Sequence, residues 1–283
     1  MNRRATIGLA AVALLISAGP PSPAVPQTAL RSVEVDGTAF RITLADGHVL
    51  GQDELPGVRL MIGDGSGRQR AIRIDAVERD PRDPDAEIML YSLSEQDAAS
   101  GEWRDLCEPD PDGRRLGFPL AGGFTGDGRH IEMSGRFLIT CTGGAEGKCV
   151  RFGYKPWRRG PDGVSLAPYY QTCVRLVRAD YCGDGIGHTR NGTPIDLFDT
   201  IGIQSDEVAP GMTFEAAWGR RSGLRASHAA EGGVGSCSTG AAMPASCGEC
   251  RRDMRRGDTG IAVQSLLRAL NPATGAATRR GRG

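Results

Sequence analysis

Eight cysteines limit the folds open to this chain more than any other feature of its sequence. All of them lie beyond residue 100. They are Cys107, Cys141, Cys149, Cys173, Cys182, Cys237, Cys247 and Cys250. An even number of cysteines outside the reducing cytosol favours disulfide bonds over free thiols. We therefore expect all of them to be half-cystines of a cross-linked fold.

Spacing constrains which cysteines can pair. Cys173 and Cys182 fall on, or at the end of, one predicted helix. Their Cα atoms would lie roughly 13 Å apart there, beyond the ~7 Å that a disulfide tolerates, so they need different partners. Cys141 and Cys149 flank a glycine-rich stretch, residues 142–148. We expect this pair to close a hairpin.

The leader, residues 1–24, has the layout of a secretory signal peptide. Arg3 and Arg4 precede an apolar run, residues 5–19, and a proline-rich segment that ends at Ala24. We expect cleavage after Ala24 and a periplasmic or secreted protein. The run is shorter than the ~20 residues needed to span a bilayer, so no transmembrane span is expected in the mature chain.

The charge balance argues against one class of partner. Lys and Arg total 34, as do Asp and Glu, so the formal net charge is zero. Removal of the two leader arginines leaves 32 minus 34, or −2. This balance gives no electrostatic reason to expect nucleic acid or an acidic membrane as partner. The expected partner is an unknown ligand or protein of the envelope or extracellular space.

Residues 31–97 are predicted to form a β-rich region. Short apolar runs are broken by Asp-Gly turns and by a polar segment, as in an antiparallel sheet or a small barrel. The predicted strands are 32–35, 38–44, 58–62, 71–77 and 87–93. The region has no cysteine, so packing alone must hold it together. Its histidine, His48, is assigned to a turn or to the surface.

Residues 98–225 are expected to form a cysteine-stapled domain around one central helix. Apolar side chains recur at helical spacing over residues 170–181. Pro168 suits the start of this helix and Gly183 its end. Strands are predicted at residues 136–141, 193–198 and 213–218.

The same region resembles a known family. Residues 178–185 read Arg-Ala-Asp-Tyr-Cys-Gly-Asp-Gly, and His188-Thr189 and Asn191-Gly192-Thr193 follow. Upstream blocks, Ile139-Thr140-Cys141-Thr142 and residues 149–157 (CVRFGYKPW), belong to the same likeness. Over roughly residues 137–218 the chain resembles the ADYC-domain family of exported bacterial proteins. The resemblance implies export and carries no reaction, because the family is named for its motif.

The acidic residues of this motif allow two interpretations. Asp180, Asp184 and Gly185 fit three positions of a calcium loop, but the side chains at two main ligand positions are unsuitable. The favoured interpretation is that both aspartates accept hydrogen bonds from backbone amides of a tight turn. A non-standard ion site that adds Asp196 or Asp199 stays open as the alternative.

An Asp-x-Asp-Gly sequence at Asp110 also has the beginning of a calcium loop. Ala121 stands where such a loop needs a bidentate glutamate. We therefore interpret the segment as an ordinary turn.

One catalytic hypothesis makes Cys182 a nucleophile. His188 would be its base, and Asp196 or Asp199 would orient the imidazole. Cys182 follows the carboxyl end of the predicted helix, where the helix dipole disfavours a thiolate. A structural half-cystine is therefore the favoured role of Cys182.

A second catalytic hypothesis uses carboxylates as general acid and base on a glycan or peptide. The candidate residues are Asp180, Asp184, His188 and Asp196. Trp157, Tyr169 and Tyr170 could offer a sugar-stacking surface, although core packing is the favoured role of these aromatic residues.

Beyond residue 225 the predicted order weakens. Residues 226–270 are expected to be a linker rich in glycine, alanine and serine, with a Cys247–Cys250 CxxC pair and a short helix. The apolar residues of that helix would be Ile261, Leu266, Leu267 and Leu270. The CxxC pair has the spacing of a redox motif or, with Cys237, of a zinc site, but disulfides are favoured. Residues 271–283 are expected to be a disordered basic tail.

The expected fold is α+β: a β-rich amino-terminal sheet or small barrel, followed by a disulfide-stapled region with one central helix. No cofactor and no metal is expected. The favoured function is that of a non-enzymatic binding or envelope-associated protein. The alternative is an extracytoplasmic hydrolase that uses His188 and the carboxylates of the central loop.

Overall fold

The computed structural model describes residues 29–63, 67–125, 129–161, 163–180, 185–199, 201–204, 213–219 and 259–265. Several predictions concern residues outside these ranges and stay predictions. They are the signal peptide, most of the linker, the tail, Asp184, Cys182, Cys237 and the Cys247–Cys250 pair.

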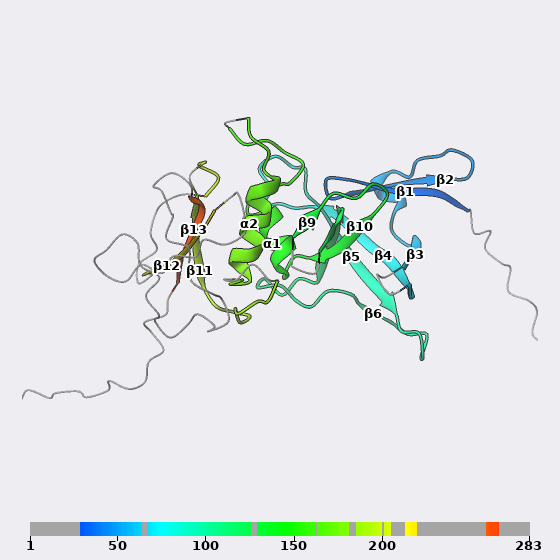
Figure 1. The fold of residues 1–283 in the computed structure, drawn as a ribbon. Coiled ribbons are helices and arrows are strands. Elements are labelled where there is room, and N and C mark those ends of the chain that lie inside the picture. Colours follow the sequence, from blue (N-terminus) through cyan, green and yellow to red (C-terminus); the bar gives the residue numbers. More distant parts are fainter. Residues whose placement is uncertain are drawn as a thin grey trace, which may run out of the picture.

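Sixteen short elements make up the described chain. In order they are β1 (Leu30–Asp36), β2 (Ala39–Leu44), the 3₁₀ turn η1 (Gln52–Glu54), β3 (Arg59–Gly63), β4 (Gln69–Arg79), β5 (Met89–Gln96), β6 (Trp103–Asp105), β7 (Leu116–Ala121), β8 (Gly123–Phe124), β9 (His130–Ile131), β10 (Phe137–Cys141), α1 (Ala145–Arg151), α2 (Ala167–Val177), β11 (Ile195–Asp199), β12 (Thr213–Gly219) and β13 (Thr259–Ser265). Figure 1 shows the two helices between the main sheet and the sheet of β11 to β13. This mixture confirms the α+β class.

The main sheet is antiparallel and open. Its strand order is β10-β7-β5-β4-β3, and β6 pairs with β5 beside that path. The end strands, β10 and β3, do not pair with each other, so the small barrel that the sequence allowed is wrong for the described strands. The five strands predicted between residues 31 and 93 are confirmed as β1 to β5.

The β1–β2 hairpin explains why no barrel forms. Its strands pair with each other, and its apolar face packs onto the main sheet. Phe40 meets the rings of Tyr91 and Phe137 edge-on, with centroid distances of 5.1 and 5.7 Å. The Phe40 N–H also donates to the Tyr91 hydroxyl (3.0 Å), and the Met89 N–H donates to Thr38 Oγ1 (2.6 Å). Because the hairpin attaches through its face, the strands form two layers instead of closing.

The predicted hairpin across residues 142–148 is wrong. This segment turns at Gly144 and begins α1. The helix packs so closely on the end of β10 that a Cβ on Gly147 would lie 2.2 Å from the Cys141 carbonyl oxygen. Since α1 carries Cys149 away from Cys141, the predicted Cys141–Cys149 disulfide is wrong as well.

Two disulfides join the described elements. Cys107–Cys141 links the segment before β7 to the end of β10, with a Cα–Cα distance of 5.5 Å. Cys149–Cys173 links α1 to α2, with a Cα–Cα distance of 5.8 Å. The second bond confirms that Cys173 does not pair with Cys182.

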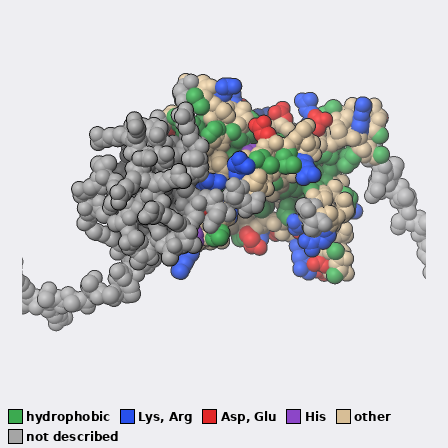
Figure 2. All heavy atoms as spheres, viewed as in Figure 1, with side chains coloured by type: hydrophobic (Ala, Val, Ile, Leu, Met, Phe, Trp, Pro, Cys, Tyr) green, Lys and Arg blue, Asp and Glu red, His purple; other side chains and the backbone are tan. Residues whose placement is uncertain are grey.

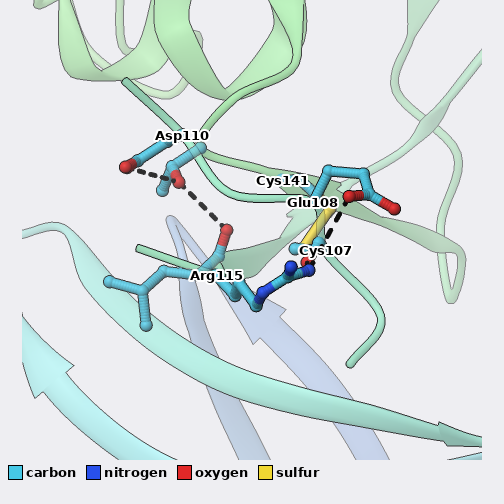
Figure 3. Close-up of a disulfide and its surroundings, with 7 residues drawn as sticks. Cys107, Glu108, Asp110, Arg115 and Cys141 are labelled. Carbon is cyan, nitrogen blue, oxygen red and sulfur yellow. Dashed lines mark hydrogen bonds and ion pairs between the residues drawn. A yellow bond between two sulfur atoms is a disulfide. The ribbon is translucent and has the colours of Figure 1, made fainter. Parts of the chain in front are cut away.

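Figure 3 shows the first disulfide with the turn that follows it. Asp110 Oδ1 accepts the N–H groups of Asp112 (3.0 Å) and Arg114 (2.9 Å), and its Oδ2 accepts the Thr142 hydroxyl (3.0 Å). The interpretation of Asp110 as a turn residue is therefore confirmed. Nearby, Arg115 Nη1 donates to the Cys107 carbonyl oxygen (3.2 Å).

The carboxyl-terminal sheet confirms two strands and corrects one helix. β11 and β12 match the strands predicted at 193–198 and 213–218. The short helix predicted from Ile261 is wrong at its start, because residues 259–265 form β13, which pairs antiparallel with both β11 and β12. Its other apolar residues, Leu266, Leu267 and Leu270, lie outside the described residues. Hydrogen bonds to two neighbouring strands outweigh a weak local helical pattern.

His48 lies at the surface, as predicted, with its Nε2 2.9 Å from Glu54 Oε1. Within the described residues, no helix is long and apolar enough to cross a membrane.

We expect the Cys149–Cys173 bond to stabilise the fold by restricting the unfolded chain. Its cysteines are 24 residues apart in sequence. Replacement of both by serine should lower the free energy of unfolding by about 3 kcal/mol, measured by urea denaturation. The Cys107/Cys141 double serine variant should lose a similar amount. A loss below about 1 kcal/mol for either variant would contradict this account.

Candidate functional site

The motif that follows α2 begins with a helix cap. The Ala179 N–H donates to the Leu176 carbonyl (2.8 Å), and the Asp180 N–H donates to the Arg175 carbonyl (2.8 Å). These two bonds define a Schellman cap, in which the residue after the helix adopts a left-handed conformation. Ala179 holds that position with φ = 52°. The helix therefore ends before Gly183, the residue predicted to end it.

Asp180 lies at the base of the loop after this cap. Its side chain is 1% exposed. Its Oδ2 accepts the Gly185 N–H (3.2 Å) and lies 3.9 Å from Nε of Arg175, which is also buried. The interpretation of Asp180 as an acceptor for a backbone amide of the turn is confirmed.

Arg178 anchors the far side of the same loop. Its carbonyl oxygen accepts the N–H groups of His188 (2.8 Å) and Thr189 (3.1 Å), while its guanidinium donates to the Gly185 carbonyl. Gly187 lies against it, since a Cβ there would be 3.2 Å from the Arg178 carbonyl oxygen. The backbone of residues 185–189 is thus fixed around one arginine.

The side chains of this loop point to solvent although its backbone is fixed. Ile186 is 58% exposed, one of the few large apolar side chains at the described surface. His188 and residues 189–194 are exposed as well. The motif therefore presents an accessible segment, residues 185–194, which we call the presented loop. Its first half, residues 185–189, is the part that Arg178 and Asp180 hold.

The proposed catalytic residues occupy different environments. Asp180 is buried at the base of the loop, and His188 is exposed on it. Asp196 lies on β11, where successive side chains alternate between faces, so it faces away from Leu197 and Asp199. Cys182 and Asp184 lie outside the described residues, so their roles stay predictions.

Asp199 faces the body of the protein, where both of its carboxylate oxygens accept hydrogen bonds. Its Oδ2 accepts the Tyr154 hydroxyl (2.7 Å) and the Gln204 N–H (2.8 Å), and its Oδ1 accepts the Ile201 N–H (2.7 Å). Burial, helped by the Asp199 carboxylate, raises the pKa of Tyr154. Tyr154 thus fixes the end of β11 to the loop after α1.

Tyr154 belongs to a block, residues 149–157, whose polar side chains reach several separate carboxylates. Arg151 Nε lies 2.5 Å from Asp80 Oδ2, and its Nη1 lies 3.5 Å from Asp110 Oδ2. Trp157 packs its ring against Gly37, where a Cβ would lie 3.2 Å from Cε2. Sequence reasoning identified the block by its family likeness but missed these roles.

Lys155 is the centre of the block. It is 4% exposed, and its Nζ lies 2.7 Å from Asp83 Oδ1, 2.7 Å from Asp85 Oδ2 and 3.3 Å from Glu87 Oε2. Burial opposes its charge, but the hydrogen bonds to Asp83 and Asp85 outweigh burial and raise the pKa of Lys155. The chain has only two lysines, Lys148 and Lys155, against 32 arginines. That scarcity is a sequence signal that could have drawn attention to this residue.

The same cluster acts on the acidic loop, residues 80–87. Burial would raise the pKa of the Asp83 carboxyl, but Lys155 and the N–H groups of Ile88 and Glu87 outweigh burial and lower it. Arg158 Nε also donates to Glu87 Oε2 (3.0 Å). The loop is therefore held by cations of the protein itself.

A cleft of ≈ 570 Å³ lies beside this cluster. It is bounded by residues 82–85, 151–153, 158–161 and 203–204. Its cations are engaged by the protein: Arg82 pairs with Asp112, Arg158 with Glu87 and Arg159 donates to the Gly163 carbonyl. Figure 2 likewise shows Lys or Arg and Asp or Glu side chains interspersed on the visible face. Arg82 and Arg158 are thus balanced by carboxylates of the protein, whereas Arg159 donates to a neutral carbonyl.

The two tyrosines cannot provide the sugar-stacking surface that the sequence allowed. Tyr169 and Tyr170 are 2% and 0% exposed, so both belong to the core. Trp157 is half-buried against Gly37. The favoured interpretation of the tyrosines, core packing, is the one that the structure supports.

Comparison with known proteins matches the chain to a protein family. A family model described as the ADYC domain matches residues 52–230, well over half of the chain. No curated protein and no solved structure matches the chain.

We expect Ala179→Gly to stabilise the protein. An alanine in the left-handed region pays a steric cost that glycine avoids, so the free energy of unfolding should rise by about 0.5–1 kcal/mol. Among the described residues, Ala86 is the other non-glycine residue with a positive φ (53°), and Ala86→Gly should raise the free energy of unfolding by a similar amount. Ala71→Gly in β4 should instead destabilise the protein, and stabilisation by this control would undermine the argument.

We expect Lys155→Met to destabilise the protein by about 3–5 kcal/mol near pH 7, because three carboxylates lose their shared cation. The Asp83 carboxyl has a lowered pKa, so its stabilising contribution exists above the unfolded pKa of about 3.8 and is lost as the pH falls through the folded pKa. The difference between variant and wild type should therefore shrink below about pH 4.

Urea denaturation at neutral and acidic pH measures this dependence. Lys148→Met, which changes the other lysine, should show neither the large loss nor the pH dependence. A Lys155→Met deficit that is unchanged by acid would mean that packing, and not charge, explains the loss.

Proposed function

The chain belongs to the ADYC domain family, and from this membership and the geometry of its motif we propose that it is an exported, disulfide-stabilised binding protein. The presented loop, residues 185–194, is the proposed contact surface. The expected partner is a ligand or protein of the envelope or the extracellular space.

The fixed backbone under exposed side chains is the observation that carries this proposal. Arg178 and Asp180 hold the loop through several hydrogen bonds, while Ile186 and His188 face solvent. A loop that is already ordered loses little conformational entropy on binding, so its contacts contribute more of their free energy to affinity. An exposed apolar side chain on such a loop is a suitable anchor.

The environments of the acidic residues favour binding over hydrolysis. A general acid and base need a defined separation and access to substrate. Asp180 is buried and bound to a backbone amide, whereas Asp196 and Asp199 lie on opposite faces of β11. Asp180 and Asp199 therefore serve turns of the protein itself, which favours a structural role over an acid–base role for these two carboxylates.

Export is supported by two independent features. The leader has the layout of a signal peptide. The two disulfides of the described chain are typical of proteins that fold in an oxidising compartment.

Variants of exposed residues on the presented loop, and of one exposed residue away from it, test the contact surface. Ile186→Ser and His188→Ala should leave the free energy of unfolding unchanged and weaken capture of a cross-linked envelope partner about tenfold or more, as expected for contacts worth 1–2 kcal/mol. Met61→Ser is the matched control, since Met61 is 65% exposed but lies on β3 in the main sheet. This control should capture the partner as the wild type does.

The same variants separate binding from catalysis. In a screen of ester, amide, glycoside and phosphate substrates, the wild type should show no turnover above background. Turnover that is abolished by His188→Ala would establish the hydrolase instead. Equal capture by all three variants and the wild type would remove the presented loop as the contact surface.

A further inference from the structure

Asn191 and Gly192 form the tip of an exposed turn. The Thr193 N–H donates to the Arg190 carbonyl (3.2 Å), and Gly192 has φ = 85°, which suits the third position of a type II turn. Both tip residues are exposed. The chain contains three asparagines, Asn2, Asn191 and Asn271, and only Asn191 precedes a glycine.

Little restrains the tip of this turn. In the part of the chain that the structure describes, neither the Asn191 side chain nor the Gly192 N–H forms a hydrogen bond. A Cβ placed on Gly192 would meet no atom within 4 Å. Among the described residues, the bond between Thr193 and Arg190 is the hydrogen bond that closes this turn. Glycine adds no side chain that would hinder the approach of its nitrogen to a neighbouring group.

We propose that Asn191 is a site of spontaneous deamidation. The Gly192 backbone nitrogen, after losing its proton, attacks Cγ of Asn191. The bond between this nitrogen and Cγ forms, the Cγ–Nδ2 bond breaks, and ammonia leaves with the proton. Water then opens the resulting five-membered succinimide at either carbonyl, which gives aspartate or isoaspartate.

The product changes the presented loop in two ways. It adds one negative charge beside Arg190, and the isoaspartate form lengthens the main chain of the loop by one methylene, four residues before β11 begins. Both changes occur without an enzyme or cofactor, because water is the co-reactant. The inference does not depend on the proposed function, since it rests on the exposure and freedom of the turn alone.

Peptide mapping of the folded, full-length protein tests this reaction. After incubation at mildly alkaline pH, the peptide that contains Asn191 should be converted into two product peptides, one with aspartate and one with isoaspartate. Both should show the mass increase of an amide-to-acid exchange. The loss should be several-fold slower at mildly acidic pH, because the attacking nitrogen must be deprotonated. Asn271 is an internal control: Pro272 follows it and has no N–H to lose, so it should stay intact.

Two variants separate the mechanism from general hydrolysis. Asn191→Gln keeps an amide but needs a less favourable six-membered ring, so it should resist the reaction. Gly192→Ala should slow it several-fold. The proposal is overturned if Asn191 in the folded protein stays intact while a free peptide of residues 188–195 deamidates under the same conditions. Equal loss at Asn191 and Asn271 would also overturn it.

Discussion

The buried ammonium group of Lys155 joins the helical region to the acidic loop of the main sheet. Lys155 comes from the loop after α1, and its three carboxylates come from the acidic loop between β4 and β5. Removing a lysine from water costs several kcal/mol, and only close opposite charges can offset that cost. The ion pairs therefore require the acidic loop and the helical region to keep one relative position.

The neighbours of Lys155 extend this connection in two directions. Arg151 reaches Asp80 and Asp110 near the main sheet, and Tyr154 reaches Asp199 at the end of β11. One short segment thus contacts both β regions that flank the helices in Figure 1. This segment supports the fold, whereas residues 186–194 after α2 are exposed.

Local patterns predicted most of the strands and the central helix. Alternating apolar runs and Asp-Gly turns locate β1 to β5, and helical spacing locates α2. The open shape of the sheet could not be predicted, because it depends on how Phe40 packs against Tyr91 across 51 residues. The disulfide pairing was missed for a related reason: α1 is only seven residues long, too short for a clear periodic signal.

The sequence predicted where the candidate site lies, but not most of the contacts that hold it. The likeness to the motif located Asp180 and His188, and the preference of aspartate for turn amides indicated the role of Asp180. The burial of Lys155, and the hydrogen bonds that the carbonyl and guanidinium of Arg178 form with the loop, depend on tertiary contacts that no local pattern encodes.

The order of the described half-cystines has a consequence for oxidative assembly. Cys107 joins Cys141, and Cys149 joins Cys173, so each covalent loop is complete before the next one begins along the chain. Neither loop encloses or interleaves with the other. A dithiol oxidase that acts on these cysteines in the order of their emergence would produce the native pairs directly, with no need to reshuffle a mismatched bond.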